Sequence, residues 1–218
     1  MKKYTAIYKD KFGEIETEIY SDGSDMYLIL RDIKFEGSDF EGLEGDIDKS
    51  KFEYTIYKDG SGELTNFELT ITIPIDIIWE SKEIIGNLIA FVATGNKKSV
   101  VRLSLKTEFE IFADEKEYGY FENALIGIQK IMPKNTKIKT CLSCKYSNYH
   151  PVGNGMFGGL NCFKNLKEDV ENVCNKTDLM NMWDKGFKNN KSFNVQEIFV
   201  CNSHKFVTKN DWVYKDWV

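Results

Sequence analysis

Phe67-Glu-Leu-Thr-Ile-Thr-Ile-Pro-Ile-Asp-Ile-Ile-Trp79 is the stretch of sequence that decides the fold. Its odd-numbered positions are all apolar, and most even-numbered positions, from Glu68 to Asp76, are polar. Successive side chains of a strand point to opposite faces, so this period of two predicts a long strand with one buried face and one solvated face. Pro74 lacks a backbone donor and indicates a bulge or an edge.

Shorter stretches of the same kind surround this strand in the first 112 residues. They are residues 4–8, 15–20, 26–33, 52–57, 87–94 and 101–112. Turn sequences separate them, and we expect Lys58–Gly62 to join 52–57 to the long strand and Gly95–Lys98 to join the last two. The run at 87–94 also suits a short helix. Short strands with regular turns predict a sandwich-like antiparallel β-rich region over residues 1–112.

The apolar pattern takes on a helical period after this region. Phe121, Ala124, Leu125, Ile128 and Ile131 recur at the spacing of one helix face, and Pro133 follows them. Beyond this helix we expect strands at 137–141 and 195–200 and short helices at 165–172 and 177–183, the last capped by Thr177. The fold class is therefore α+β, with residues 113–218 forming a helix plus a cysteine-containing α+β region that can pack with residues 1–112 as one domain.

All five cysteines lie in this second region. Cys141-Leu-Ser-Cys144 is a C-x-x-C turn, in which two thiolates can face one ion, and Cys162 follows a glycine-rich loop. Structural zinc takes four ligands, commonly four cysteines or three cysteines and a histidine. The spacing predicts a structural zinc site that includes Cys141 and Cys144. Cys162, Cys174, Cys201 and His204 compete for the other two places.

Two other interpretations of these thiols stay open. Cysteines also pack as small buried hydrophobic residues, and a C-x-x-C pair can be a disulfide or a redox pair. The first ten residues do not resemble a signal peptide, and no stretch approaches the ~18 apolar residues of a membrane helix. We therefore expect a cytoplasmic protein without membrane contact, in which a reducing environment favours metal binding over disulfides.

A motif around the thiols resembles an uncharacterised family of bacterial proteins. The motif reads Cys141-x-x-Cys144-x-Tyr146-Ser147-x-Tyr149-x-Pro151-x-Gly153 and then Phe157-Gly158-x-Leu160-x-Cys162-Phe163. A downstream V-Q-E segment and a cysteine are similar to Val195-Gln196-Glu197 and Cys201 here. The resemblance covers about residues 120–206 and implies no established activity. It implies Cys141, Cys144, Cys162 and Cys201 as the linked set, with Cys174 outside it; Lys164 stands where the family has arginine.

Charge divides the chain into an acidic and a basic part. Residues 1–132 carry 16 Lys and Arg against 26 Asp and Glu, whereas residues 133–218 carry 13 Lys against 8 Asp and Glu. The acidic part repels nucleic acid, and the basic part could attract it. Both arginines, Arg31 and Arg102, lie in the acidic part, so arginine readout of bases is absent where the chain is basic.

These observations predict a non-enzymatic, zinc-stapled cytoplasmic protein that binds a protein partner, such as an inhibitor or immunity-type protein. No residue is predicted to be catalytic, and none to bind an organic cofactor. One alternative is a zinc-ribbon-like protein that binds nucleic acid by stacking Tyr146, Tyr149 and Phe157 on bases. Another is a zinc-dependent hydrolase with His150 as proton shuttle. The G-x-G-x-x-G sequence at 153–158 lacks the βαβ context of a dinucleotide site.

Overall fold

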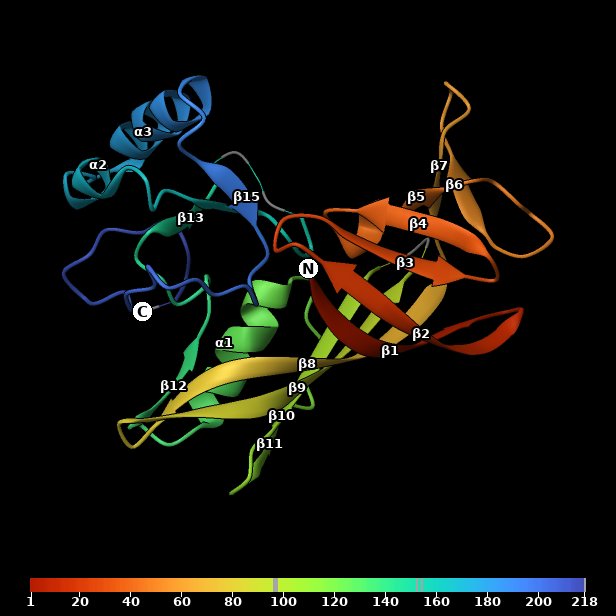
Figure 1. Ribbon diagram of the computed structural model, residues 1–218, viewed down its shortest axis with the longest axis horizontal. Coiled ribbons are helices and arrows are strands. Elements are labelled where there is room, and N and C mark those ends of the chain that lie inside the picture. The colour runs from red at the N-terminus through yellow and green to blue at the C-terminus, as the bar shows by residue number, and fades with distance from the viewer. Residues whose placement is uncertain (96–97, 152, 154, 218) are drawn as a thin grey trace.

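The computed structural model describes residues 1–95, 98–151, 153 and 155–217. Its main element is one antiparallel sheet of 12 strands (Figure 1). Eleven of them follow the order β11-β10-β9-β8-β1-β2-β3-β4-β5-β7-β6, and the twelfth, β12, also pairs with β8. The strands are β1 Lys2–Asp10, β2 Gly13–Ser21, β3 Met26–Leu30, β4 Ile33–Gly37, β5 Glu44–Gly45, β6 Tyr54–Ile56, β7 Gly62–Leu64, β8 Phe67–Trp79, β9 Lys82–Thr94, β10 Val100–Lys106, β11 Ile111–Ala113 and β12 Thr136–Lys139. A 3-10 turn, η1 Phe40–Gly42, follows β4.

The long strand predicted from the alternating sequence is β8, which forms a hairpin with β9. Their register runs from Phe67 opposite Thr94 to Trp79 opposite Lys82. The odd-numbered residues of β8 from Phe67 to Ile77 are buried. The segment 87–94 lies in β9 and is a strand, as expected, and not a helix.

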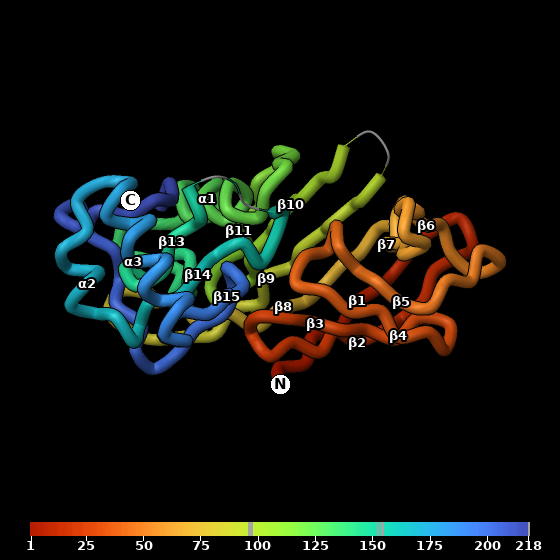
Figure 2. Tube along the Cα trace, turned by 90° about the horizontal axis from the view of Figure 1, so that it is seen from above, coloured from red at the N-terminus to blue at the C-terminus, as the bar shows by residue number. Residues whose placement is uncertain are grey.

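The other edge of β8 serves two separate parts of the chain. Strand β1 pairs with residues 68–72 of β8, and β12 pairs with residues 76–79. Pro74 lies between these two partners, so its missing donor interrupts neither ladder. Figure 2 shows the consequence, since the β8–β9 hairpin lies between a β lobe at one end and a cysteine lobe at the other. We use β lobe for β1–β7 with the paired halves of β8 and β9, and cysteine lobe for residues 140–217.

Aromatic side chains close the β lobe around its own core. The ring of Phe52 lies 4.9 Å from Phe35 of β4 and 6.2 Å from Tyr8 of β1, and Tyr8 lies 5.5 Å from Phe67 of β8. Phe52, which lies outside the strands, thus bridges β1 and β4, which are not neighbours in the sheet, so the sheet curls over its apolar face. The antiparallel, β-rich N-terminal region and the α+β class are confirmed.

Three details of the strand prediction are wrong. The stretch 26–33 is not one strand, because Arg31 and Asp32, with φ of +47° and +67°, form the turn between β3 and β4. The turn at Lys58–Gly62 joins β6 to β7 and not to the long strand, because Asn66 has a φ of +55° and separates β7 from β8. The stretch 101–112 is likewise not one strand. A turn in which the Thr107 N–H donates to the Glu110 carbonyl over 2.9 Å divides it into β10 and β11. An uninterrupted strand would place Ile111 on the same face as the buried Val101 and Leu105, but Ile111 is 68 % exposed.

The helix expected from the periodic apolar residues is α1, Phe121–Ile131, and it packs against β10. The cysteine lobe adds a three-stranded antiparallel sheet and two helices: β13 Ser147–Tyr149, β14 Leu160–Cys162, α2 Lys167–Glu171, α3 Lys176–Lys188 and β15 Phe193–Val195. Asn175, and not Thr177, caps α3, because its side chain accepts from the Asp178 N–H. The strand expected at 195–200 ends at Val195.

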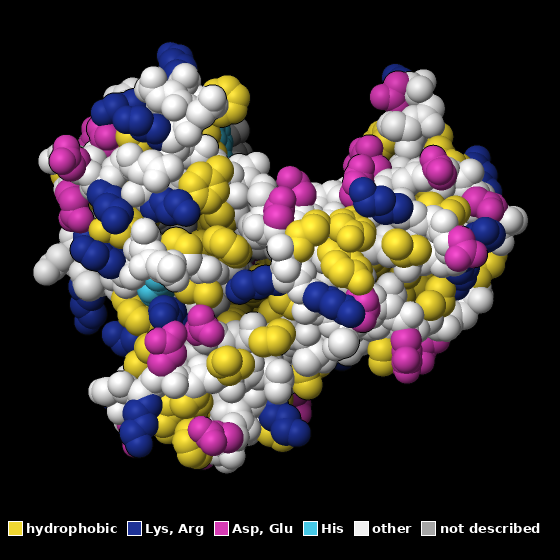
Figure 3. Space-filling view, in the orientation of Figure 1, with side chains coloured by type: hydrophobic (Ala, Val, Ile, Leu, Met, Phe, Trp, Pro, Cys, Tyr) yellow, Lys and Arg dark blue, Asp and Glu magenta, His cyan; other side chains and the backbone are white. Residues whose placement is uncertain are grey.

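Strand β11 crosses the boundary that the sequence suggests at residue 112, and β12 joins the same sheet. The predicted turn at Gly95–Lys98 includes residues 96 and 97, which lie outside the described residues, as does Asn154 of the glycine-rich loop. Within the described part of the chain, no helix is both long and apolar enough to cross a membrane. The surface is hollowed at the top of the view in Figure 3, between the α2–α3 end and the β6–β7 hairpin.

Candidate metal centre

Cys141 and Cys144 lie in a tight turn that directly follows β12. The Cys144 N–H donates to the Cys141 carbonyl over 3.1 Å, which closes the turn. The Ser143 hydroxyl holds the turn from inside, since it accepts from the Thr140 N–H and donates to the Thr140 carbonyl, both at 3.0 Å. Backbone and serine groups thus fix the turn, and both thiols are left free of disulfides and buried.

A second turn, Cys201–His204, faces the first. The His204 N–H donates to the Cys201 carbonyl over 3.0 Å, which repeats the hydrogen bond of the first turn. The two turns are tied together because the Val207 N–H donates to the Ser143 carbonyl over 3.0 Å and His204 Nε2 lies 3.1 Å from the Ser143 hydroxyl. Burial lowers the pKa of His204 to about 4, so this imidazole is neutral at pH 7.

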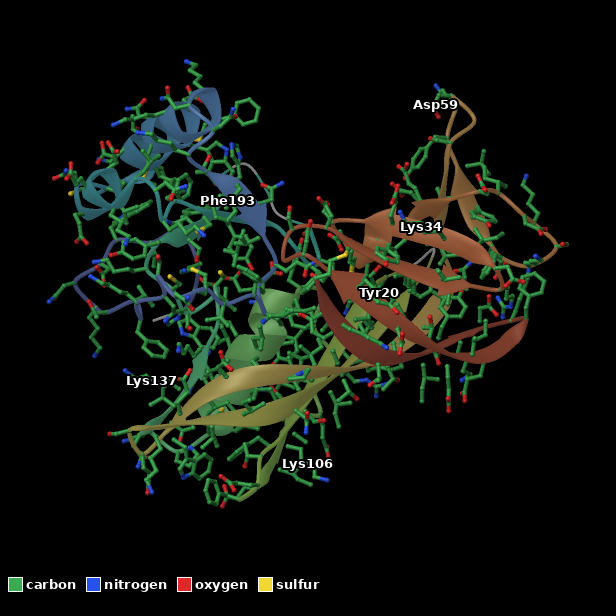
Figure 4. All side chains as sticks on the ribbon, viewed as in Figure 1. Tyr20, Lys34, Asp59, Lys106, Lys137 and Phe193 are labelled. Atoms are coloured by element: carbon green, nitrogen blue, oxygen red, sulfur yellow. The ribbon has the colours of Figure 1, made fainter. Side chains whose placement is uncertain are left out.

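Cys162 joins these turns from β14, where it pairs with Ser147 of β13. Burial raises the pKa of the Cys141 thiol well above its usual value, and charge on Cys162, Cys144 and Cys201 raises it further. The pKa of Cys162 is raised to about 11, first by burial and then by Cys201 and Cys144. Cys141 and Cys162 therefore both lie within electrostatic range of Cys144 and Cys201. Sulfur atoms gather in the left half of Figure 4.

The four predicted cysteines thus lie in two facing turns and a neighbouring strand, and His204 lies against the first of these turns. Cys174 is exposed between α2 and α3, where its sulfur lies 3.7 Å from the Asn172 carbonyl. The His204 ring contacts Ser143 and the ring of Phe206, at 4.6 Å. His150 packs edge-on against Trp183 at 4.7 Å.

Four unpaired thiols are a suitable donor set for zinc, which prefers soft thiolate ligands in closed structural sites. In the part of the chain that the structure describes, no three His, Cys, Asp or Glu side chains already stand in a metal-ligating arrangement. The fit of the centre therefore rests on the convergence of the four thiols and on their chemistry.

Lys215 lies beside the thiols and was not singled out by its sequence. Its ammonium donates to the Cys144 carbonyl and, over 2.9 Å, to the Ser147 hydroxyl. Burial lowers the pKa of Lys215 to about 8, and charge on Cys144, Cys141, Glu122 and Cys162 opposes that shift. Lysine is almost always at the surface, so a buried lysine leaves no signal in one sequence.

The V-Q-E segment is a strap between the thiol turn, the glycine-rich loop and the β lobe. The Glu197 carbonyl accepts from the Leu142 N–H over 3.2 Å. Its side chain accepts from the Tyr149 hydroxyl over 3.0 Å and from the Gly158 N–H over 2.7 Å. Burial raises the pKa of Glu197 to about 7, and these hydrogen bonds lower it only in part.

Gln196 carries the strap into the β lobe. Its side-chain oxygen accepts from the Ser21 hydroxyl over 2.6 Å, and its N–H donates to the Gly23 carbonyl over 2.7 Å. A side chain at Gly23 would collide with the ring of Phe199. The segment noted in the sequence as V-Q-E is therefore an interface between the two lobes.

The glycine-rich loop is part of the same interface. Backbone groups of Met156 and Phe157 hydrogen-bond to the Asp39 carboxylate, whose pKa burial raises to about 6. A Cβ at Gly155 would collide with that carboxylate, and a Cβ at Gly158 with the Ser38 carbonyl. The glycines thus permit close approach of the two lobes. Since the loop joins the antiparallel strands β13 and β14, it also lacks the strand–loop–helix order of a dinucleotide site.

A family model of unknown function, DUF6304, matches residues 2–147. The chain belongs to this family. The DUF6304 region spans the β lobe, α1, β12 and the first thiol pair, whereas Cys162 and Cys201 lie beyond it. It overlaps the motif resemblance, expected over residues 120–206, only at 120–147. No curated protein and no solved structure matches the chain significantly.

Proposed function

We propose that this DUF6304 protein holds one structural zinc ion through Cys141, Cys144, Cys162 and Cys201, and that it is a non-enzymatic binding protein. The observation that carries the metal proposal is that four unpaired cysteines lie in two facing turns and a strand, where charge on Cys144 and Cys201 would raise the pKa of both Cys141 and Cys162. Four thiolates saturate tetrahedral zinc, which leaves no open position for water and favours a structural role over hydrolysis. Zinc would supply the link between segments that are far apart in the sequence.

The packing of the cysteine lobe supports the need for such a link. Its own apolar cluster consists of eight buried residues: Cys144, Tyr146, Phe163, Leu166, Val170, Val173, Leu179 and Met182. A core of this size gives limited stability, and small modules of this kind commonly rely on a metal. The thiol turns lie where that cluster meets the main core, so a bound ion would join the two.

Metal analysis by mass spectrometry tests this proposal. The untagged protein, purified under reducing conditions, is expected to contain about one zinc per chain, as a closed four-ligand site requires. Cys201→Ser should lower the zinc content, whereas Cys174→Ser, at the exposed cysteine, should leave it unchanged. Absence of metal from the parent, with all thiols titrating freely, would contradict the proposal.

For the partner, we propose a basic protein segment that binds the outer face of β1, β2 and β8. A groove of about 660 Å³ lies there, lined by Thr5, Ala6, Ile7, Glu16, Thr17, Glu18, Thr70 and Thr72. Ile7 is 41 % exposed in a mostly polar lining, and Glu16 is exposed opposite it in the register. Acidic groups around one apolar side chain suit a Lys- or Arg-bearing segment, and the acidic charge of residues 1–132 would steer it.

Charge reversal tests this surface. Affinity capture from native lysate should recover a stoichiometric basic protein at low salt, and Glu16→Lys/Glu18→Lys, at the two acidic residues of the groove, should abolish its recovery. The control Glu115→Lys/Glu117→Lys makes the same change in charge at exposed positions outside the groove and should leave the recovery of the partner unchanged. Equal recovery by both double variants would exclude the groove as the partner site.

The nucleic-acid alternative loses its stacking residues. Tyr146, Tyr149 and Phe157 are each 3 % exposed or less, so they do not present ring faces to bases. The hydrolase alternative needs the His150 ring to face an open coordination position of the zinc. The His150 ring packs edge-on against Trp183. A salt series with single-stranded oligonucleotides and a zinc-exchange measurement check these alternatives directly.

A further inference from the structure

The backbone on either side of Lys215 is held in place. The Tyr214 N–H donates to Asn148 Oδ1 over 2.7 Å, and the Asp216 N–H donates to Glu122 Oε1 over 2.9 Å. Both acceptors belong to other segments of the fold, one in β13 and one in α1. The position of the Lys215 side chain is therefore built into the structure.

The hydrogen-bond partners of the Lys215 ammonium are neutral. They are the Cys144 carbonyl and the Ser147 hydroxyl, and Ser147 itself donates to the carbonyls of Cys144 and Cys141. The ammonium is enclosed by protein, while the half-buried residue as a whole borders a cavity of about 440 Å³ that Glu122 and Tyr149 also line. The groups whose negative charge would favour the ammonium are chiefly thiols: Cys144, Cys141, Glu122 and Cys162.

Lys145, in the same lobe, shows the usual arrangement by contrast. Its ammonium lies 2.8 Å from a Glu171 oxygen and 3.0 Å from an Asp211 oxygen, so two carboxylates balance its charge. An enclosed cation without such balance is costly, because burial removes hydration that neutral acceptors replace only in part. With neutral thiols, the Glu122 carboxyl would be the one group left of the four that favour the charge of Lys215, so its burial would be poorly compensated.

We propose that Lys215 is the built-in counter-ion of the thiol centre, and that it makes the site selective for a metal bound as an anionic tetrathiolate. This inference rests on the proposed zinc function. One divalent ion with four thiolates has a net charge of −2, and an ammonium beside Cys141, Cys144 and Cys162 lowers the cost of burying that charge. The same contacts destabilise the metal-free protein and stabilise the loaded one.

The test uses the opposite effects that Lys215 should have on the stability of the metal-free and the zinc-bound protein. Lys215→Met and Lys215→Gln are compared with the parent, and Lys209→Met, at an exposed lysine, is the control. Zinc affinity is measured by competition with a chromophoric chelator, and thermal unfolding is followed with and without zinc. We expect both Lys215 variants to bind zinc about 10–100-fold more weakly, the usual effect of losing an outer-shell partner. We also expect the metal-free variants to unfold at a higher temperature than metal-free parent.

The glutamine variant separates charge from hydrogen bonding, because an amide can still donate to the Cys144 carbonyl. Recovery of parent zinc affinity by Lys215→Gln, or a loss of stability of equal size in both forms, would show a hydrogen-bonding role and overturn the counter-ion. In that case zinc binding by the parent leaves the proposed function standing. If the parent binds no zinc, the proposed function and the counter-ion both fail.

Discussion

The backbone N–H of Leu142 donates to the carbonyl of Glu197 over 3.2 Å, and this bond joins the first thiol turn to the strap between the lobes. One residue before Glu197, Gln196 bonds to Ser21 of the β lobe. Four residues after it, Cys201 begins the second thiol turn. The short segment 196–201 therefore connects the two thiol turns to the interface between the lobes.

The first prediction is that loss of one thiol loosens the cysteine lobe more than the β lobe. Cys141→Ser removes a ligand from a site that supplies on the order of 10 kcal/mol in small zinc modules. Hydrogen exchange should show lost protection in β13, β14 and β15, while β8 and β9 keep theirs. Cys174→Ser is the matched control, and the same protection pattern in both variants would mean that Cys141 only packs.

The alternation from Phe67 to Trp79 was sufficient to predict β8, because a period of two reports directly on which face is buried. The helix Phe121–Ile131 was predicted to the residue for the same kind of reason. The pairing of β12 with β8 could not be predicted, since it joins segments almost 60 residues apart and depends on tertiary packing. Local turn chemistry at Asn66 and Thr107 also divided runs that look continuous in apolar pattern.

The site shows a similar division. The spacing of Cys141 and Cys144 predicted the first turn, and the resemblance implies Cys201 over His204 and Cys174 as the fourth ligand, which stays a prediction. The Asp39 carboxylate and Lys215 were missed, because each is a charged residue of a type normally found at the surface. Only contacts formed on folding reveal that they are enclosed.

The second prediction concerns pH and Glu197. Its pKa is raised to about 7 from an ordinary value of 4.5, so the folded state binds this proton more tightly than the unfolded state. The protonated Glu197 side chain therefore contributes about 3 kcal/mol to the unfolding free energy. This contribution is fully present below pH 4.5 and is lost as pH rises through 7. Glu197→Gln removes the titrating carboxyl and with it this pH-dependent contribution. The unfolding free energies of the metal-free variant and the metal-free parent should therefore differ by an amount that changes between pH 4.5 and 7.

Denaturant titrations of both proteins from pH 4 to 8 measure that difference. His204, whose pKa is lowered to about 4, acts in the opposite direction, because its unfolded form takes up a proton below about pH 6.5. This contribution is common to parent and variant and cancels in the comparison. A difference that stays constant across the range would show that folding does not shift the pKa of Glu197.

The third prediction tests the close approach of the lobes at the glycine-rich loop. Gly158 has a φ of +77°, and a Cβ there would meet the Ser38 carbonyl. Gly158→Ala should therefore lower the unfolding free energy by roughly 2–4 kcal/mol, from backbone strain and a steric clash together. Gly42→Ala is the control, because Gly42 has ordinary φ and open space around its Cβ position. Equal denaturation midpoints for the two variants would mean that the lobes separate easily at this point.

The fourth prediction isolates the hydrogen bond between Ser21 and Gln196. Both residues are 1 % exposed, so removal of one partner leaves the Ser21 hydroxyl proton or the Gln196 side-chain oxygen buried without this hydrogen bond. Ser21→Ala and Gln196→Ala should each cost about 1–3 kcal/mol. The double variant should cost less than the sum, because the second substitution removes a group that the first has already left without a partner. Full additivity in a double-mutant cycle would show that this contact does not hold the strap, and other contacts, such as the bond from the Gln196 backbone N–H to the Gly23 carbonyl, would then hold it.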